Sequence, residues 1–229
     1  MRREDSPFPA GWWSSSKEPL WPIRSTYDLV SFDVLPTLPV ERFDGSFAWL
    51  LEQSMSGGGL DYNRDESDSV GLDALPSLQA AAHAHGLNLP QTFVRFVSDP
   101  EIHRRAPTPC AGYLGFSPNL IEDPSGRGGK MLRFLNDSQG CLFWYLYLSP
   151  HGESCVLGST EWHYADQVRE SQTLDPDNYF WSGPDFESFI FRFWIEGQIS
   201  HRSFAGNPLA PELDAYVSAA QRALKNLTA

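Results

Sequence analysis

The stretch from Lys130 to Ser159 constrains the fold more than any other part of this chain, because dense apolar content is combined there with clear turn sequences. Its central run, Cys141 to Leu148, is too apolar to face water and too short to span a bilayer. We therefore predict that this run is a buried strand of a soluble domain. Short turns flank it on both sides and require antiparallel neighbours, so residues from about 131 to 159 should form a meander.

Alternation of side chains along the central strand predicts two different faces of the sheet. One face is wholly apolar and is expected to be core; it carries Leu142, Trp144, Leu146 and Leu148. The opposite face carries two phenol hydroxyl groups, which need hydrogen-bond partners or water. Internal packing is the simpler interpretation of this second face. The functional interpretation is an aromatic binding surface that helices cover only in part, formed by Phe143, Tyr145 and Tyr147.

Helical periodicity is clearest after the meander, where Asp185 is placed to cap the first turn of a predicted helix. The apolar stripe of this helix is formed by Phe186, Phe189, Ile190, Phe193 and Trp194. A stripe of this width suits the face of a sheet, so we expect the helix to lie against the meander. A last helix is predicted from Pro211 onwards.

The chain before the meander divides into an extension and the start of a main body. Residues 1–70 are predicted to form an N-terminal extension with a loose lead-in, a strand over 27–34, a helix near 43–54 and an acidic linker. Residues 71–229 are predicted to form the main domain, which begins with a helix and ends with the C-terminal helix. The expected fold is therefore α+β, with an antiparallel or mixed central sheet packed by helices and an N-terminal strand–helix appendage.

Charge limits the classes of partner. The chain has 229 residues and a formal net charge of −12, with acid concentrated in the segments 61–73 and 161–187. This charge argues against a nucleic-acid partner, whose phosphates require clustered Lys and Arg, and it fits a basic protein partner. Solubility alone is the simpler explanation of such a surface. No segment approaches ~20 apolar residues and no signal sequence is recognisable, so we expect a cytoplasmic protein with no membrane partner.

No motif in the sequence is sufficient for catalysis, cofactor binding or metal binding. The glycine-rich run 125–130 resembles a phosphate loop, but Pro124 replaces its first glycine and a strand follows where a helix is required. The run 152–156 resembles a nucleophile elbow, but Val156 stands where glycine must relieve the tight turn. The histidines show no ligand spacing, and the three cysteines lack a C-x-x-C pair. We therefore predict no catalytic residue, no cofactor and no metal site.

A polar and aromatic cluster follows the third strand of the meander, and acidic residues continue beyond it. Its simpler interpretation is a loop anchored by Trp162, and its functional interpretation is part of a binding surface. Together with the second face of the central strand, this cluster supplies the predicted protein-binding residues. They are Phe143, Tyr145, Tyr147, Glu161, Trp162, His163, Asp166 and Glu170.

The order of motifs resembles a known superfamily. A helix leads into Gly86-Leu87-Asn88-Leu89-Pro90 and the Phe-rich run 93–96, a meander with Trp144 on its central strand follows, and a helix opening at Asp185 closes the series. Over about residues 72–200 this order resembles the SUKH superfamily, which includes fungal cell-wall-synthesis regulators of the Smi/Knr type and many bacterial immunity proteins. The chain departs from that pattern at 98–100, where Ser-Asp-Pro replaces the usual Asn-Gly-Gly, and its N-terminal extension has no counterpart.

The resemblance implies a non-enzymatic α+β domain that binds another protein, in bacteria often a toxin. The leading hypothesis is therefore a cytosolic immunity-type protein or regulatory adaptor, a monomer or weak homodimer, that occludes a basic toxin or nuclease-like partner. One alternative is a hydrolase-like enzyme with a cleft between the loop 104–129 and the residues Glu161 and His163. The other is a homo-oligomeric scaffold that pairs through Tyr145 and Tyr147 or through the C-terminal helix.

Overall fold

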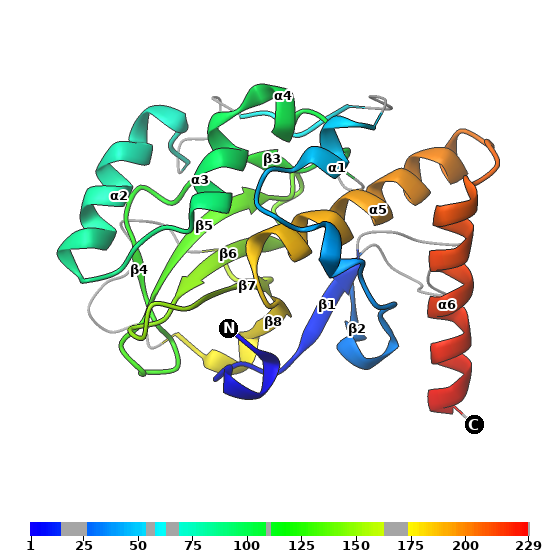
Figure 1. The fold of residues 1–229 in the computed structure, drawn as a ribbon. Helices are drawn as coiled ribbons and strands as arrows, with labels where there is room; N and C mark the ends of the chain where they lie inside the picture. The colour runs from blue at the N-terminus through cyan, green and yellow to red at the C-terminus, as the bar shows by residue number, and fades with distance from the viewer. Residues whose placement is uncertain (15–26, 54–57, 63–68, 109–110, 163–173, 229) are drawn as a thin grey trace.

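The computed structural model describes residues 1–14, 27–53, 58–62, 69–108, 111–162 and 174–228 (Figure 1). Within these ranges helices pack against an antiparallel sheet, which confirms the predicted α+β class. The long helix α5 crosses in front of the sheet, and α6 stands at one side of the molecule (Figure 1).

The central sheet has the strand order β3-β5-β6-β7-β8, and β4 also pairs with β5. Every pairing within it is antiparallel. The predicted meander corresponds to β5, β6 and β7, whereas β8 has no counterpart in the sequence-based expectation. The strands are β3 (Tyr113–Leu114), β4 (Ile121–Glu122), β5 (Lys130–Asn136), β6 (Phe143–Leu148), β7 (Ser154–Ser159) and β8 (Tyr179–Gly183).

Most helices fall where apolar spacing and capping residues predict them, with shifted ends, whereas the one-turn helix Pro100–His103 was not predicted. A stretch of 3₁₀ helix, Leu72–Ala74, leads into α2, and Pro90 immediately precedes α3. The C-terminal helix starts at Pro211 as predicted, because proline lacks the N–H that has no partner in a first turn. The described helices are α1 (Ala48–Leu51), α2 (Leu75–Ala84), α3 (Gln91–Ser98), α4 (Pro100–His103), α5 (Phe186–Phe204) and α6 (Pro211–Thr228).

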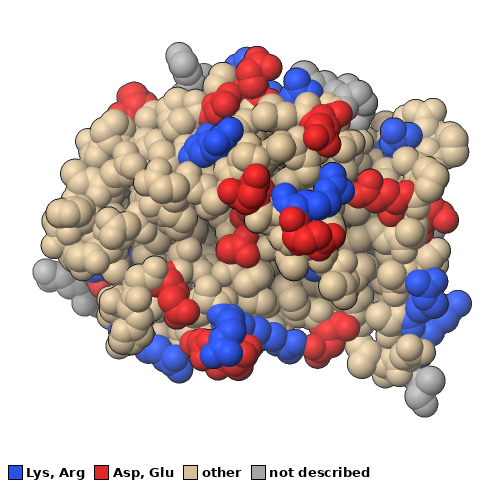
Figure 2. Space-filling view, in the orientation of Figure 1, with Lys and Arg blue, Asp and Glu red and all other residues tan. Residues whose placement is uncertain are grey.

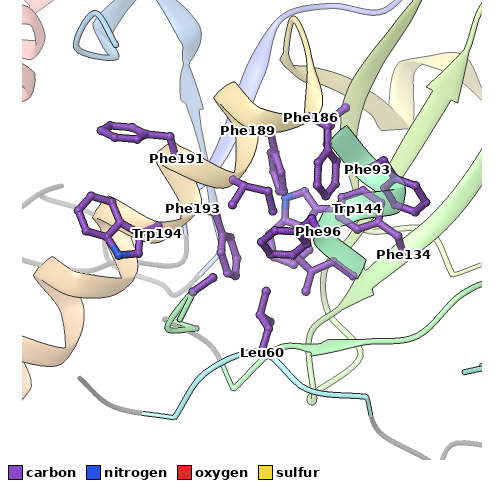
Figure 3. Close-up of a cluster of buried hydrophobic side chains, with 14 of the residues drawn as sticks. Leu60, Phe93, Phe96, Phe134, Trp144, Phe186, Phe189, Phe191, Phe193 and Trp194 are labelled. Carbon is purple, nitrogen blue, oxygen red and sulfur yellow. The ribbon is translucent and has the colours of Figure 1, made fainter. Parts of the chain in front are cut away.

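Helix α5 organises the main core. Asp185 caps it, since its Oδ1 accepts a hydrogen bond from the Ser188 amide at 2.8 Å. Phe189 faces the sheet, with ring centroids 5.9 Å from Phe134 on β5 and 6.2 Å from Trp144 on β6. Figure 3 shows these rings converging, with Leu60 closing the cluster from a separate segment. The predicted packing of this helix against the meander is therefore confirmed.

The N-terminal segment is built into the same body. Two short strands, β1 (Gly11–Ser14) and β2 (Asp28–Ser31), pair with each other, and Trp181 of β8 donates its amide to the Pro9 carbonyl at 2.8 Å. Trp12 is buried and its ring lies 5.6 Å from that of Phe189. Residues 8–14 are thus largely packed rather than loose, while residues 15–26 of the predicted lead-in lie outside the described residues. The predicted boundary at residue 70 divides segments that share one core.

The opposite edge of the sheet is covered by residues from the predicted acidic linker. Leu60 donates its amide to the Ala106 carbonyl at 3.0 Å, and Leu114 of β3 donates to the Asp61 carbonyl at 2.9 Å. Val70 and Phe116 exchange a pair of backbone hydrogen bonds, each of 2.9 Å. These contacts satisfy backbone groups that an open sheet edge would expose.

Two N-terminal elements are shorter than predicted. The expected strand over 27–34 ends at Ser31, and a 3₁₀ helix, η2 (Phe32–Val34), replaces its second half. The expected helix near 43–54 shrinks to α1, because Phe47 has φ 58 in the left-handed region. The Phe47 ring is fully buried, 5.4 Å from the ring of Phe96, so tertiary packing overrides the local helical pattern there.

Candidate functional site

The second face of β6 is a packed core and not a surface. Phe143, Tyr145 and Tyr147 are 0%, 0% and 1% exposed. Phe8 and Trp181 cover them from the N-terminal segment and from β8 and belong to the same apolar cluster. Internal packing, the simpler interpretation of this face, is therefore confirmed, and the alternative of a partly open aromatic surface is wrong. The face is buried because Tyr179 and Trp181 of β8, which extends the same sheet beyond β7, lie beside it and Phe8 of the N-terminal segment packs over it. The sequence pattern revealed neither segment.

The predicted cluster after β7 closes this second core. The Tyr145 hydroxyl donates to the Glu161 carbonyl at 2.5 Å, and the Trp162 ring lies 4.6 Å from that of Phe143. The guanidinium carbon of buried Arg133 lies 3.8 Å from the centre of the Trp162 ring. The structure thus brings Tyr145, Glu161 and Trp162 together, and their contacts are those of a loop anchored by its tryptophan.

The Glu161 side chain is exposed and accepts a hydrogen bond from the Asn178 amide nitrogen at 3.0 Å. The other three predicted residues, His163, Asp166 and Glu170, lie outside the described residues. The enzyme cleft suggested for Glu161 and His163 therefore stays a prediction.

Tyr147 belongs to a different polar network, centred on Asp123. Its hydroxyl donates to the Asp123 carboxylate at 3.1 Å, and burial together with this negative charge raises the pKa of Tyr147. The same carboxylate accepts backbone amides from Ser125, Arg127 and Gly129, at 2.8, 3.1 and 3.2 Å. Three amides of the glycine-rich run therefore donate to an internal carboxylate, which holds the run against β6 through Tyr147.

Replacement of Gly129 by alanine is expected to lower the free energy of unfolding by about 1–3 kcal/mol, as overpacking of a core does. A Cβ atom at this position would lie 2.6 Å from the Tyr147 hydroxyl oxygen, below any normal contact distance. Urea unfolding of the variant measures the loss. Gly58→Ala is the control, because a Cβ atom there meets no atom within 4 Å. Equal free energies of unfolding for the two variants would contradict the prediction, because they would show that the Tyr147 side chain moves aside without loss of stability.

A cleft of about 810 Å³ lies beside α4. We call it the α4 cleft. It lies where the two described ends of the acidic segment 61–73 meet the start of α4. Its lining residues are Asp61, Tyr62, Ser69, Gly71, Leu72, Asp73, Pro100, His103 and Arg104.

The inner wall of the α4 cleft is formed by Tyr62 and His103, whose rings are in contact. Pro100 has no N–H, so the Phe96 carbonyl lacks the amide partner that a continuing helix would supply. The Tyr62 hydroxyl donates to the neighbouring Val97 carbonyl at 2.9 Å, and its ring contacts the His103 ring edge-on at 5.8 Å. His103 is 3% exposed, and burial lowers its pKa and so favours the uncharged ring.

The rim of the cleft is polar, with one apolar residue exposed in it. Asp61 and Arg104 form an ion pair of 2.9 Å, and both side chains are more than half exposed. Asp73 is also exposed, and Leu72 next to it is 37% exposed. Such a rim suits a partner side chain that combines an apolar stem with a positive charge, because the stem covers Leu72 while the charge meets the carboxylates.

The arrangement offers no recognisable catalytic pair among the described lining residues. Neither ring nitrogen of His103 forms a hydrogen bond of normal geometry, so no carboxylate or hydroxyl group is positioned against it as a base or nucleophile would require. Across the described ranges, no group of three or more His, Cys, Asp or Glu side chains could hold a metal ion. In the same ranges no helix is both long enough and apolar enough to cross a membrane.

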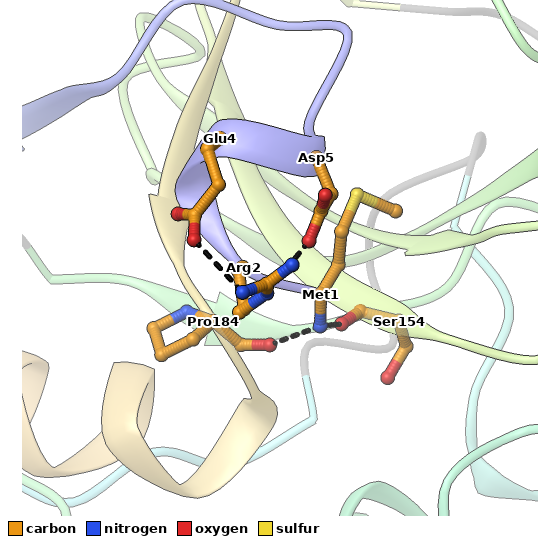
Figure 4. Close-up of polar contacts among 6 residues, drawn as sticks. All are labelled: Met1, Arg2, Glu4, Asp5, Ser154 and Pro184. Atoms are coloured by element: carbon orange, nitrogen blue, oxygen red, sulfur yellow. Dashed lines mark hydrogen bonds and ion pairs between the residues drawn. The ribbon is translucent and has the colours of Figure 1, made fainter.

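A smaller hollow of about 510 Å³ surrounds the start of the chain. The Met1 amino group donates to the Ser154 carbonyl at 2.7 Å and the Pro184 carbonyl at 2.9 Å, and Arg2 pairs with Glu4 and Asp5 (Figure 4). Two of its lining carboxylates, Glu4 and Asp5, are thus already paired with Arg2. We regard it as a secondary site.

Sequence reasoning missed Tyr62 and His103, although it recognised the segment 61–73 as acidic. Linear spacing gave no signal, because Tyr62 and His103 meet only when residues 59–62 cover the sheet edge at Leu114. Comparison of the chain with family models, with curated proteins and with solved structures gives no match.

Proposed function

We propose that the protein is a non-catalytic, cytosolic protein-binding domain of the SUKH immunity type, which occludes a basic partner through the α4 cleft. The observation that carries this proposal is the rim of the cleft, which exposed Leu72 shares with the carboxylate of Asp73 and with that of Asp61, the latter paired with Arg104. An aliphatic surface bordered by carboxylates suits a Lys or Arg side chain of another protein, because the stem covers the apolar surface and the positive charge meets the carboxylates.

The distribution of charge supports a basic partner. Seven of the described cations are buried or paired: Arg133 and Arg192 are buried, and Arg2, Arg3, Arg42, Arg104 and Lys130 pair with carboxylates. The chain as a whole carries −12, so its surface keeps an excess of acid that local pairing does not neutralise. Figure 2 shows that acidic and basic groups are interspersed on one face, so the field is diffuse and acts mainly by steering an approaching basic protein.

Partner binding is expected to fail when the rim is altered. The combined change Leu72→Asp and Asp73→Lys should raise the Kd for a basic partner at least tenfold, by about 1.4 kcal/mol or more, because it removes both the apolar contact and the carboxylate. The partner is first captured from the proteome of the source organism at low salt, then purified and titrated calorimetrically against the wild-type protein and the variant.

The matched control is Leu29→Asp on β2, where the original leucine is 41% exposed and so similar to Leu72. It should bind the partner as the wild-type protein does, and the wild-type complex should weaken as salt is added. A partner whose affinity is unchanged by the rim variant, or whose binding is independent of salt, would remove this proposal. Turnover of the partner or of a small substrate would replace it with the enzyme alternative.

A further inference from the structure

The end of α5 presents an unusually exposed aromatic side chain. Phe204 is 97% exposed, whereas Val40, the next most exposed large apolar residue in the part of the chain that the structure describes, is 62% exposed. The other aromatic residues along the same helix are buried. An isolated surface leucine is unremarkable in a soluble protein, but a phenylalanine with almost its whole ring in water is the kind of residue that anchors an interface.

The turn that carries Phe204 is held in a defined shape. The Gly206 amide donates to the Ser203 carbonyl at 3.1 Å, and Gly206 has φ +67, which closes the helix in a left-handed turn. The Asn207 amide donates to the Arg202 carbonyl at 2.9 Å. Because the backbone is already ordered, binding through Phe204 would cost little additional conformational entropy. We call residues 200–210 the α5–α6 tip.

The chemistry of the tip complements the α4 cleft. Residues 200–210 contain His201 and Arg202 but no acidic residue, in a chain that is strongly acidic overall. The rim of the α4 cleft carries two carboxylates and one guanidinium group, around exposed Leu72. Its volume of about 810 Å³ is ample for an aromatic side chain together with the turn that presents it. The tip of the same molecule does not fill this cleft, since Phe204 is exposed.

We infer that the α5–α6 tip of one copy docks into the α4 cleft of a second copy, with Phe204 over Leu72 and Arg202 facing the rim carboxylates. The two surfaces are different patches of the chain, so the contact is heterologous and joins copies head to tail. The inference shares the cleft with the proposed function but requires no foreign partner. Self-association would cover the rim and so compete with partner binding.

Sedimentation of the full-length protein from micromolar to millimolar concentration tests this inference. The wild-type weight-average mass should rise with concentration, and Phe204→Asp or Leu72→Asp alone should weaken association by about thirtyfold or more, as loss of a hot-spot residue does. Both positions are exposed, so both variants should unfold at the wild-type urea concentration.

Mixing the two variants is the decisive step. Phe204→Asp keeps an intact cleft and Leu72→Asp keeps an intact tip, so the mixture should form a 1:1 dimer that cannot grow further. A wild-type protein that stays monomeric, a mixture that forms no dimer, or association that survives either single change would each overturn the inference. Calorimetric titration of Phe204→Asp with the basic partner separates the two proposals, because this variant should retain partner binding.

Discussion

Replacing Phe189 with alanine is expected to lower the free energy of unfolding by about 3–5 kcal/mol, the range found for buried phenylalanines. Phe189 is fully buried, and its ring contacts aromatic rings from three other elements. These are Trp12 of β1, Phe134 of β5 and Trp144 of β6, at centroid distances of 5.6, 5.9 and 6.2 Å. Alanine would leave a cavity bounded by rigid rings, which cannot collapse to fill it.

Urea unfolding followed by tryptophan fluorescence measures this loss, and Phe204→Ala is the matched control on the same helix. Because Phe204 is 97% exposed, its removal should change the free energy of unfolding by less than about 0.5 kcal/mol. A double-mutant cycle with Trp12→Ala extends the test to the N-terminal segment. Additive losses from Trp12 and Phe189 would mean that β1 does not share the core, against the contact described above.

Glu187→Ala is expected to lower the free energy of unfolding by about 2–4 kcal/mol, because two donors lose their acceptor. Glu187 lies on α5 and is 3% exposed. Its Oε1 accepts the Trp49 indole N–H at 2.9 Å, and its Oε2 accepts the Gly45 amide at 2.7 Å. The carboxylate therefore holds the segment around α1 against α5. Glu52→Ala, at an exposed position at the end of α1, should have little effect by comparison.

The same site should make stability depend on pH. Burial raises the pKa of Glu187 above its ordinary value of 4.5, although the hydrogen bonds from Trp49 and Gly45 oppose the shift. A carboxyl group with a raised folded-state pKa contributes stability that is fully present below the unfolded pKa and is lost as pH rises through the folded pKa. The stability of Glu187→Gln relative to wild type should therefore increase as pH rises from 4.5, then level off.

Urea midpoints of wild type and Glu187→Gln, measured from pH 4 to pH 8, show this difference, with Glu52→Gln as the exposed control. Glutamine supplies only one acceptor oxygen, so the variant is offset by a constant loss at every pH. If the stability of Glu187→Gln relative to wild type fell as pH rises, the pKa of Glu187 would be lowered and not raised. The two hydrogen bonds would then affect this pKa more than burial does.

The parts of the fold that local pattern specifies were predictable. The meander β5–β7 follows from an apolar run between two turn sequences, and α5 follows from Asp185 and a stripe at helical spacing. Each of these patterns lies within about 20 consecutive residues, so it can be recognised in the sequence without knowing which segments pack against it. The strand β8 has no such signal, because Tyr179–Gly183 is short and becomes a strand by pairing with β7.

The candidate site was predictable only in its charge. The acidic character of the segment 61–73 is visible in the sequence, but the cleft exists because Asp61 and Tyr62 run beside β3 and meet α4. The hypothesis of an open aromatic surface on β6 was wrong for a related reason. Alternation shows that Phe143, Tyr145 and Tyr147 share a face, yet whether that face meets water depends on distant segments such as the one carrying Phe8.

The sequence by itself determined the α+β class, the central meander, the capped helix that covers it and the acidic charge, because these depend on composition and on contacts between near neighbours. Only the tertiary structure decided that both faces of the sheet are buried, that the N-terminal segment belongs to the core, and that Tyr62 and His103 share a cleft. These features join residues far apart in the chain, and no periodic pattern encodes which distant segment will cover a given face or edge.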